Sequence, residues 1–158
     1  MSKNKTSLQT GNFYAIGLSY KKADAEIRGH FSLDETAQIN LLTQAKKEGV
    51  PSLIVISTCN RTELYGIAQH PFQIIKLLCE QTKGSVEEFE KVAYIHKNKE
   101  AVSHLFKVGT GLDSQILGDF EIISQLKFGA RASKKAGLLN SFTERLLNAV
   151  IQASKRIK

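Results

Sequence analysis

Cys59 is the residue of this sequence whose type and position most directly indicate chemistry. It follows the apolar run 53–56 and two polar residues, where a buried strand would end and a loop would begin. A strand end is a rigid platform, and the loop after it exposes the side chain. Thiolate is the reactive form of cysteine, so an exposed thiol near a cation is a candidate nucleophile. A cysteine after an apolar strand is also a common packing residue, and both interpretations stay open at this point.

Arg61 lies two residues after the thiol. Side chains at positions i and i+2 of an extended segment point the same way, so Arg61 could stabilise a thiolate or bind a carboxylate with its planar guanidinium. Cys79, which follows Leu77 and Leu78 in a predicted helix, is expected to be structural. Two cysteines without a CxxC spacing indicate neither a disulfide scaffold nor a zinc site, and we expect free thiols in a reducing compartment.

The hydrophobic pattern predicts an α+β fold. Apolar runs predict strands at 13–18, 53–56, 63–68 and 92–95, and helical spacing predicts helices at 34–48 and 71–83. The order β-α-β-β-α-β is that of a ferredoxin-like sheet. From residue 99 onward the chain is expected to be helical, over 99–112, 119–136 and 140–157. We therefore expect a disordered lead-in at 1–11, an α+β catalytic domain at 12–97 and a helical part of that domain at 98–158.

Composition and charge restrict the class of protein. The 158 residues are 42% hydrophobic and 23% charged, as in a globular domain. The sequence contains neither an apolar run of about 20 residues nor a signal-peptide pattern, so a cytoplasmic, non-membrane protein is expected. Residues 127–158 hold eight Lys or Arg and one acid, which accounts for the whole net charge of +7. This basic segment is either a solvated helical face or a surface that attracts a polyanion such as tRNA.

The residues around Cys59 resemble a family signature. Residues 57–65 read Ser-Thr-Cys-Asn-Arg-Thr-Glu-Leu-Tyr, which is similar to the signature of the glutamyl-tRNA reductases. Further blocks resemble the same family in the same order: 17–20 with 26–28, 101–108, 111–114, 117–118 with 122 and 125, and 154–156. The resemblance covers residues 13–158, and it implies the catalytic domain at the N-terminus of that enzyme.

The resemblance implies a reaction. In this family the thiol attacks the ester that joins glutamate to tRNA, and NADPH from a second domain reduces the resulting thioester to glutamate-1-semialdehyde, a precursor in tetrapyrrole (5-aminolevulinate) biosynthesis. It also implies glutamyl-tRNA as the substrate, a homodimeric full-length enzyme, glutamate-1-semialdehyde aminomutase as a partner, and no metal. No GxGxxG follows a predicted strand here, so the NADPH site is expected outside this chain. The basic end at Lys158 suggests a piece of a longer protein, able to form or hydrolyse the thioester without reducing it.

The resemblance also assigns residues. Cys59 takes the position of the nucleophile, and His104 that of a histidine that acts as a base or steers water onto the thioester. The implied substrate-binding positions are Thr58, Asn60, Arg61, Ser114, Asp119, Phe120, Glu121 and Gln125. Arg61 would pair with the glutamate carboxylate, and an acid at 121 could hold its ammonium group. Without the resemblance, His104 would be an ordinary histidine at the edge of an apolar helix face.

The sequence departs from the family pattern in two regions, residues 20–24 and residues 118–122. Tyr20 stands where the family has His, and Lys22-Ala23-Asp24 where it has Thr-Ala-Pro. Residues 118–122 read Gly-Asp-Phe-Glu-Ile instead of Gly-Glu-Pro-Gln-Ile, which affects the expected glutamate pocket. Two alternatives remain: a cysteine-dependent esterase or hydrolase that uses Cys59 with His104, and a non-catalytic RNA-binding module. Few aromatic residues accompany the basic segment, which disfavours a stacking platform for RNA.

Overall fold

The fold is taken from a computed structural model, which describes residues 11–113 and 121–157. The expected disordered lead-in falls almost wholly on residues 1–10 and so lies outside the described residues. The same holds for the start of the predicted helix 119–136. Within the described ranges, no helix is long and apolar enough to cross a membrane.

A sheet of four strands forms the centre of the molecule. The strands are β1 (Asn12–Ser19), β2 (Ser52–Ser57), β3 (Arg61–Ala68) and β4 (Tyr94–Lys97). Their order is β2-β3-β1-β4, and every neighbouring pair is antiparallel. This is the strand arrangement of the split βαβ, ferredoxin-like pattern, so the predicted fold class is confirmed.

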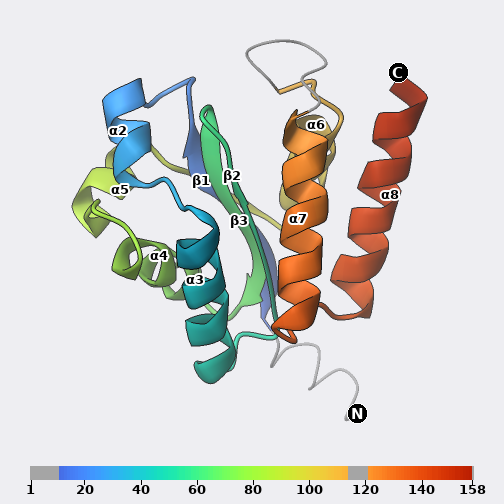
Figure 1. The fold of residues 1–158 in the computed structure, drawn as a ribbon, viewed down its shortest axis with the longest axis horizontal. Helices are drawn as coiled ribbons and strands as arrows, with labels where there is room; N and C mark the ends of the chain where they lie inside the picture. Colours follow the sequence, from blue (N-terminus) through green and yellow to red (C-terminus); the bar gives the residue numbers. More distant parts are fainter. Residues whose placement is uncertain (1–10, 114–120, 158) are drawn as a thin grey trace.

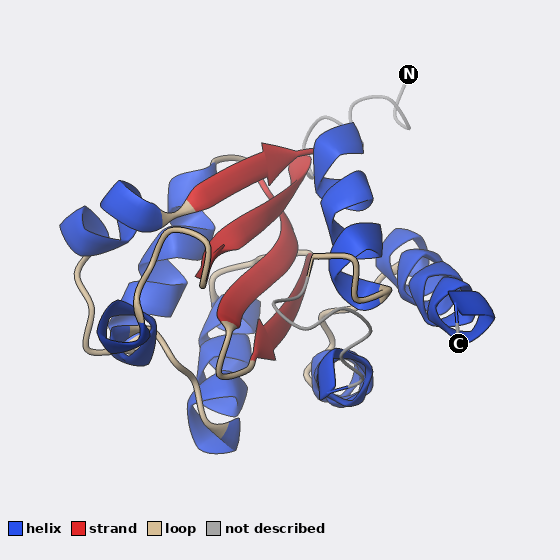
Figure 2. Cartoon of the chain, turned by 90° about the horizontal axis from the view of Figure 1, so that it is seen from above, coloured by secondary structure: helices blue, strands red, loops and turns tan. Residues whose placement is uncertain are grey.

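Helices cover both faces of the sheet, which gives three layers (Figures 1 and 2). The first layer contains α2 (Ala25–His30), α3 (Glu35–Lys47), α4 (Pro71–Glu80) and α5 (Val86–Val92). The other layer contains α6 (Lys99–Gly109), α7 (Glu121–Lys135) and α8 (Ser141–Ile157). Alternate side chains of each strand therefore enter two different cores, which explains why the four central residues of β2, 53–56, are all apolar.

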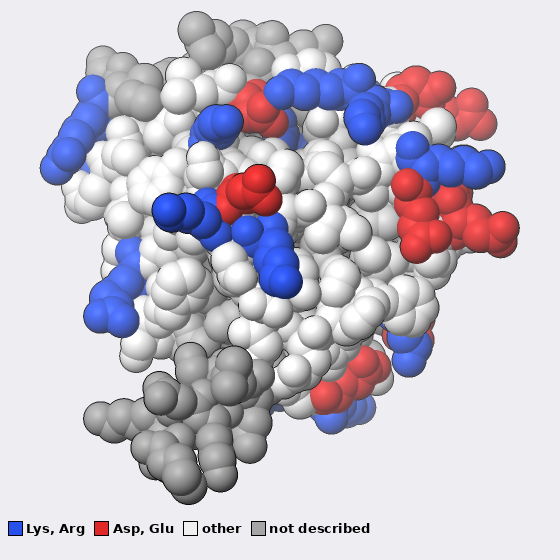
Figure 3. Space-filling view, turned by 180° about the vertical axis from the view of Figure 1, so that it is seen from behind, with Lys and Arg blue, Asp and Glu red and all other residues white. Residues whose placement is uncertain are grey.

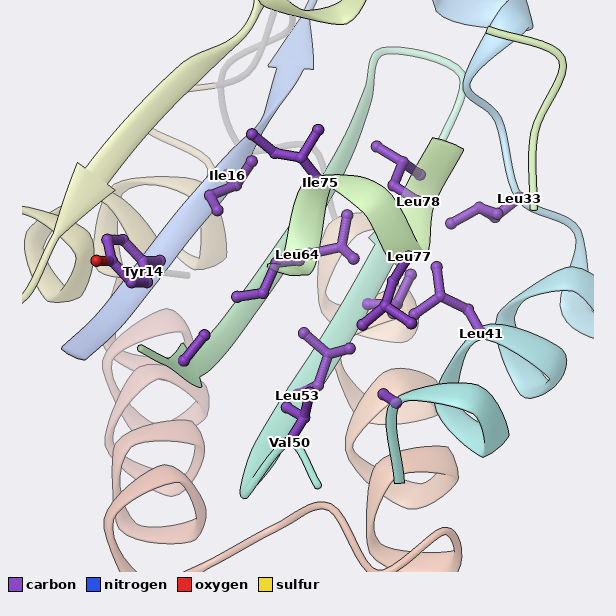
Figure 4. Packing of buried hydrophobic residues seen from close by; sticks show 14 of the residues in the cluster. Tyr14, Ile16, Leu33, Leu41, Val50, Leu53, Leu64, Ile75, Leu77 and Leu78 are labelled. Atoms are coloured by element: carbon purple, nitrogen blue, oxygen red, sulfur yellow. The ribbon is translucent and has the colours of Figure 1, made fainter. Parts of the chain in front are cut away.

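The core on the α3 and α4 side is built mainly from aliphatic residues, with Tyr14 at its edge (Figure 4). Leu53 and Leu64 from the sheet meet Ile74, Leu77 and Leu78 of α4, and all five side chains are almost fully buried. Burial of such side chains contributes roughly 1.5–3 kcal/mol each. This core holds the β2–β3 hairpin, and therefore the Cys59 turn at its end, in a fixed position.

Helix α7 seals the outer edge of β2. The Ser133 hydroxyl donates to the Leu53 carbonyl at 2.6 Å, and the Leu53 amide donates to the Leu138 carbonyl at 3.0 Å. Gly129 permits this approach, because a Cβ there would lie 2.6 Å from the Val55 carbonyl oxygen. The amide and the carbonyl of Leu53, which an edge strand would otherwise expose, are thus satisfied by α7 and by the segment that follows it.

The structure also corrects the predicted elements. Two short helices, α2 and α5, were not predicted, and the last strand begins at Tyr94 instead of Val92 because α5 continues to Val92. A capping signal was present in the sequence, since the Ser85 hydroxyl accepts from the Glu88 amide at 3.1 Å. Helix α6 ends at Gly109, three residues before the predicted end, and α4 ends at Glu80.

The contact of α7 with β2 predicts opposite effects for two glycine substitutions. In a helix, Gly→Ala normally stabilises by roughly 0.5–1 kcal/mol. Gly129→Ala should instead lower the free energy of unfolding by about 1–3 kcal/mol, because its methyl group meets backbone that cannot yield. Gly29→Ala in α2 is the matched control: nothing lies within 4 Å of its Cβ position, so stability should stay the same or rise. Urea unfolding of both variants tests this, and a Gly129→Ala protein as stable as the parent would contradict the packing.

Candidate active site at the end of the β2–β3 hairpin

Cys59 lies in the short turn that joins β2 to β3. The turn is closed by a hydrogen bond from the Thr58 amide to the Arg61 carbonyl at 2.8 Å, and the Thr58 hydroxyl accepts from the Asn60 amide at 3.2 Å. The Tyr20 amide, just after β1, donates to the Asn60 carbonyl at 2.9 Å. The Cys59 thiol itself is free and exposed. The backbone is held on both sides while the sulfur stays accessible, as a nucleophile requires.

A second arginine also reaches this turn. Nε of Arg28, near the end of α2, donates to the Cys59 carbonyl at 3.1 Å, and its Nη1 donates to the Ala23 carbonyl at 2.7 Å. The Asp24 carboxylate caps α2 by accepting from the Ile27 amide at 2.9 Å. The unpredicted helix α2 therefore serves to bring a cation to the thiol turn.

Arg61 begins β3 and is buried, with 3% of its side chain exposed. Its Nη1 lies 3.2 Å from Glu63 Oε2, and its Nη2 lies 3.1 Å from Asp113 Oδ2 and also donates to the Asp113 carbonyl. Burial alone would lower the pKa of Arg61, but the neighbouring acidic groups, with Glu63 the strongest and Asp113 among them, together outweigh burial and raise the pKa. Arg61 is thus a permanent cation paired with two carboxylates, and a substrate carboxylate would have to share it with Asp113 or displace Asp113.

Glu63 is the centre of the site. Its carboxylate is fully buried and accepts from Arg61, from the hydroxyls of Tyr65 and Tyr94, and from His104 Nε2 at 2.6 Å. Burial alone would raise the pKa of Glu63, but the hydrogen bond from His104 and the charge of Arg61 outweigh it, so the pKa lies below its ordinary value. Burial, together with the Glu63 charge, raises the pKa of both tyrosines. The carboxylate therefore stays ionised, with its neighbours acting as donors.

Gly17 makes this arrangement sterically feasible. It pairs with Glu63 on one side and with Tyr94 on the other, so the three residues lie at the same level across β3, β1 and β4. A Cβ at position 17 would lie 2.3 Å from the Thr62 carbonyl oxygen and 2.8 Å from Glu63 Cγ. The bare backbone of β1 thus leaves room for the Glu63 side chain to reach residues beyond the neighbouring strand.

His104 extends from α6 onto Glu63. A carboxylate can only accept, so Nε2 carries a hydrogen, and in the neutral ring Nδ1 is then the atom with the free lone pair. The His96 ring lies 4.6 Å from the His104 ring, centroid to centroid. Burial and the neighbouring His104 lower the pKa of His96. An open pocket of about 220 Å³ borders both imidazoles and is lined by His96, Glu100, Ser103, His104 and Lys107.

The structure brings some of the predicted site residues together and leaves others apart. Thr58, Cys59, Asn60 and Arg61 share the thiol turn, and His104 joins Arg61 through Glu63. In the described chain no hydrogen bond links Cys59 to His104, so they do not form a direct thiol–imidazole pair. Gln125 lies half-buried on α7. Ser114, Asp119 and Phe120 lie outside the described residues, as does the side chain of Glu121.

Sequence reasoning missed four residues of the site: Arg28, Glu63, Tyr94 and Asp113. Their spacing in the sequence does not indicate a common site, because they come from α2, β3, β4 and the segment after α6. One signal for Glu63 was available in the sequence: it begins a predicted strand two residues after Arg61, so an acid and a base share one face and can pair. The structure shows that all eight positions of β3 are buried, which makes such a pairing necessary.

Fold and site together define a class of protein: an α+β domain with a ferredoxin-like sheet that presents an exposed candidate thiol beside a buried charge network. Comparison with solved structures supports the fold. The chain is similar to glutamyl-tRNA reductase from Methanopyrus kandleri, with a TM-score of 0.74 and 22% identity over 92% of this chain and 34% of that one.

Sequence comparison then shows the family. The model of the glutamyl-tRNA(Glu) reductase N-terminal domain matches residues 16–158, and the chain belongs to this family. It is 74% identical over 147 residues to a glutamyl-tRNA reductase of Christiangramia forsetii, covering 93% of this chain and 35% of that protein. The corresponding protein of Flavobacterium psychrophilum is 70% identical over 156 residues, covering 99% and 38%. The chain thus spans about a third of the length of these relatives.

The Glu63 network predicts a pH-dependent contribution to stability. Removal of one partner from a buried ion pair costs about 3–5 kcal/mol, so Glu63→Gln should lower the free energy of unfolding by that order at pH 7. Because the folded-state pKa of Glu63 is depressed, its contribution is present above the unfolded-state pKa of about 4.3 and is lost as pH falls below it. The difference between parent and variant should therefore shrink at pH 3.

Urea unfolding at the two pH values measures this difference. Glu26→Gln, at an exposed position of α2, is the matched control and should change stability by less than about 0.5 kcal/mol. If Glu63→Gln costs no more than this control at pH 7, the carboxylate is not the structural centre of the site.

Proposed function

We propose that this chain is the part of a glutamyl-tRNA reductase that accepts the glutamyl group, with Cys59 as the nucleophile, in tetrapyrrole biosynthesis. The observation that carries the proposal is the thiol turn: an exposed sulfur on a hairpin end whose backbone is fixed by four hydrogen bonds. The family membership supplies the substrate class, an aminoacyl ester of tRNA.

The proposed step is an acyl transfer. The Cys59 thiolate attacks the carbonyl carbon of the glutamyl ester, a C–S bond forms, and the C–O bond to the terminal ribose of the tRNA breaks. The leaving ribose oxygen takes up a proton and tRNA departs. Because the thioester is a better acceptor of a nucleophile than the ester, covalent catalysis divides one difficult step into two easier ones.

The buried network would orient the groups around the thioester. Arg61 offers a planar guanidinium, which the substrate carboxylate could bind by displacing the Asp113 carboxylate. Asp113 also forms an ion pair with Lys21 at the surface. The tautomer fixed by Glu63 leaves His104 Nδ1 as a base for a water molecule that enters through the open pocket. Hydrolysis of the thioester is then the expected side reaction of the chain alone.

The reduction step requires NADPH, which would supply the hydride to the thioester. The sheet is antiparallel throughout, and the described residues contain no parallel βαβ unit of the kind that binds a dinucleotide. We therefore assign no NADPH-binding residue to this chain, and propose that an NADPH-binding domain, a second subunit and glutamate-1-semialdehyde aminomutase act together with it. We propose no metal.

Intact mass spectrometry tests the acyl transfer. After incubation with glutamyl-tRNA, the protein should gain one glutamyl group, and Cys59→Ser should gain none. Cys79→Ser is the matched control, because the Cys79 thiol is half-buried in α4 and burial raises its pKa. It should be acylated like the parent. His104→Ala should keep the adduct longer, because loss of the base slows hydrolysis by roughly 10²–10⁴-fold.

Two outcomes would contradict the proposal. Absence of both an adduct and Cys59-dependent deacylation of the tRNA would remove the acyl-transfer function. Equal turnover of other aminoacyl-tRNAs would favour a general thiol esterase.

The basic segment offers a surface for the tRNA. Lys127, Arg131 and Lys135 are exposed and lie four residues apart, on one face of α7. By contrast, Lys and Arg alternate with Asp and Glu on the face that Figure 3 presents. No ion pair engages these three cations within the described ranges, and such a ridge of positive charge is what a phosphate backbone attracts.

Replacement of these three residues by Gln should weaken tRNA binding and flatten its salt dependence. Each lost phosphate contact should reduce the slope of log K against log salt by roughly 0.7–0.9. The control triple Lys91, Lys97 and Lys99, equally exposed but outside α7 and α8, should have a smaller effect. Filter binding at several salt concentrations measures both, and equal or larger losses in the control would place the tRNA elsewhere.

A further inference from the structure

Arg28 is the cation that contacts the thiol turn directly. The resemblance to the family gave it no role, and Arg61, the cation expected there, is occupied by Glu63 and Asp113. Arg28 instead donates to the carbonyl of Cys59 itself, at 3.1 Å. The two arginines thus have separate tasks: Arg61 belongs to the buried network, and Arg28 to the backbone of the nucleophile.

The two hydrogen bonds of Arg28 form a clamp between the backbone before α2 and the thiol turn. One planar guanidinium bridges two carbonyl oxygens, of Ala23 before α2 and of Cys59 after β2, which are far apart in sequence. Arginine suits this task because its donors are held in a rigid fork, whereas a lysine ammonium is a point charge on a flexible chain. Hydrogen bonds from a charged donor are also stronger than neutral ones.

The clamp completes the support of the turn. Hydrogen bonds to Asn60 from Tyr20, and between Thr58 and Arg61, fix the residues on either side of the thiol. The Cys59 carbonyl lies between these residues, and Arg28 fixes its orientation. Within the described part of the chain, Nη2 of Arg28 has no acceptor, so a donor of a permanently charged group remains beside the turn.

We propose that Arg28 is a positioning residue for the nucleophile: by clamping the Cys59 carbonyl it holds the thiol in the orientation that attacks the acyl ester. This inference rests on the proposed acyl transfer. Since misplacement of a reacting group by about 1 Å can cost about 100-fold in rate, loss of the clamp should appear in the rate of acylation and not in substrate affinity.

Single-turnover acylation by glutamyl-tRNA is the test, with rate and affinity measured separately. Arg28→Ala should acylate roughly 10- to 100-fold more slowly than the parent at saturating substrate, with unchanged tRNA affinity. Arg28→Lys should recover part of the rate, and millimolar guanidinium should partly rescue Arg28→Ala. Lys22→Ala removes the same charge from an exposed neighbour of α2 and should acylate like the parent.

Several results would overturn the inference. These are a parental rate in Arg28→Ala, a loss that appears only as weaker affinity, and an equal loss in Lys22→Ala. If Arg28→Ala does not fold, Arg28→Gln, which keeps the stem and one donor, serves the same comparison. Failure of the parent protein to form any adduct would instead refute the proposed function, so the two failures can be told apart.

Discussion

The buried carboxylate of Glu63 is the constraint on which the site depends. An ionised group with no exposed surface must have all its acceptor positions satisfied, and four side chains from β3, β4 and α6 do this. Each of these donors is thereby fixed in position. The contacts that stabilise the buried carboxylate also orient Arg61 and the imidazole of His104. The site is therefore arranged by the same interactions that stabilise the folded core.

The position of the network explains features that look unrelated in the sequence. Gly17 has no side chain, and Glu63 can therefore extend across β1. Helix α6 packs on the sheet at the level where His104 donates a hydrogen bond to the Glu63 carboxylate. On the opposite side of the sheet, a mainly aliphatic core anchors the β2–β3 hairpin. The thiol turn is therefore supported by apolar packing on one face and by a charged network on the other.

Periodicity and turn chemistry predicted the sheet and five of the seven helices that the described residues form, because β2 and α4 carry strong, local patterns. They missed α2 and α5, which are only six and seven residues long. The thiol turn was predictable from local sequence, but the clamp by Arg28 and the pairing of Arg61 with Asp113 were not. Those contacts join residues 31 and 52 positions apart, and only the tertiary fold brings them together.

The function proposed for this chain depends on Cys59, held at the hairpin end, taking up the acyl group. Peptide mapping of the protein after brief incubation with glutamyl-tRNA, quenched and digested at low pH to preserve thioesters, tests it most directly. We expect a hydroxylamine-sensitive glutamyl group on the peptide that contains Cys59. A glutamyl group on Cys79, or on a residue other than cysteine, would contradict it.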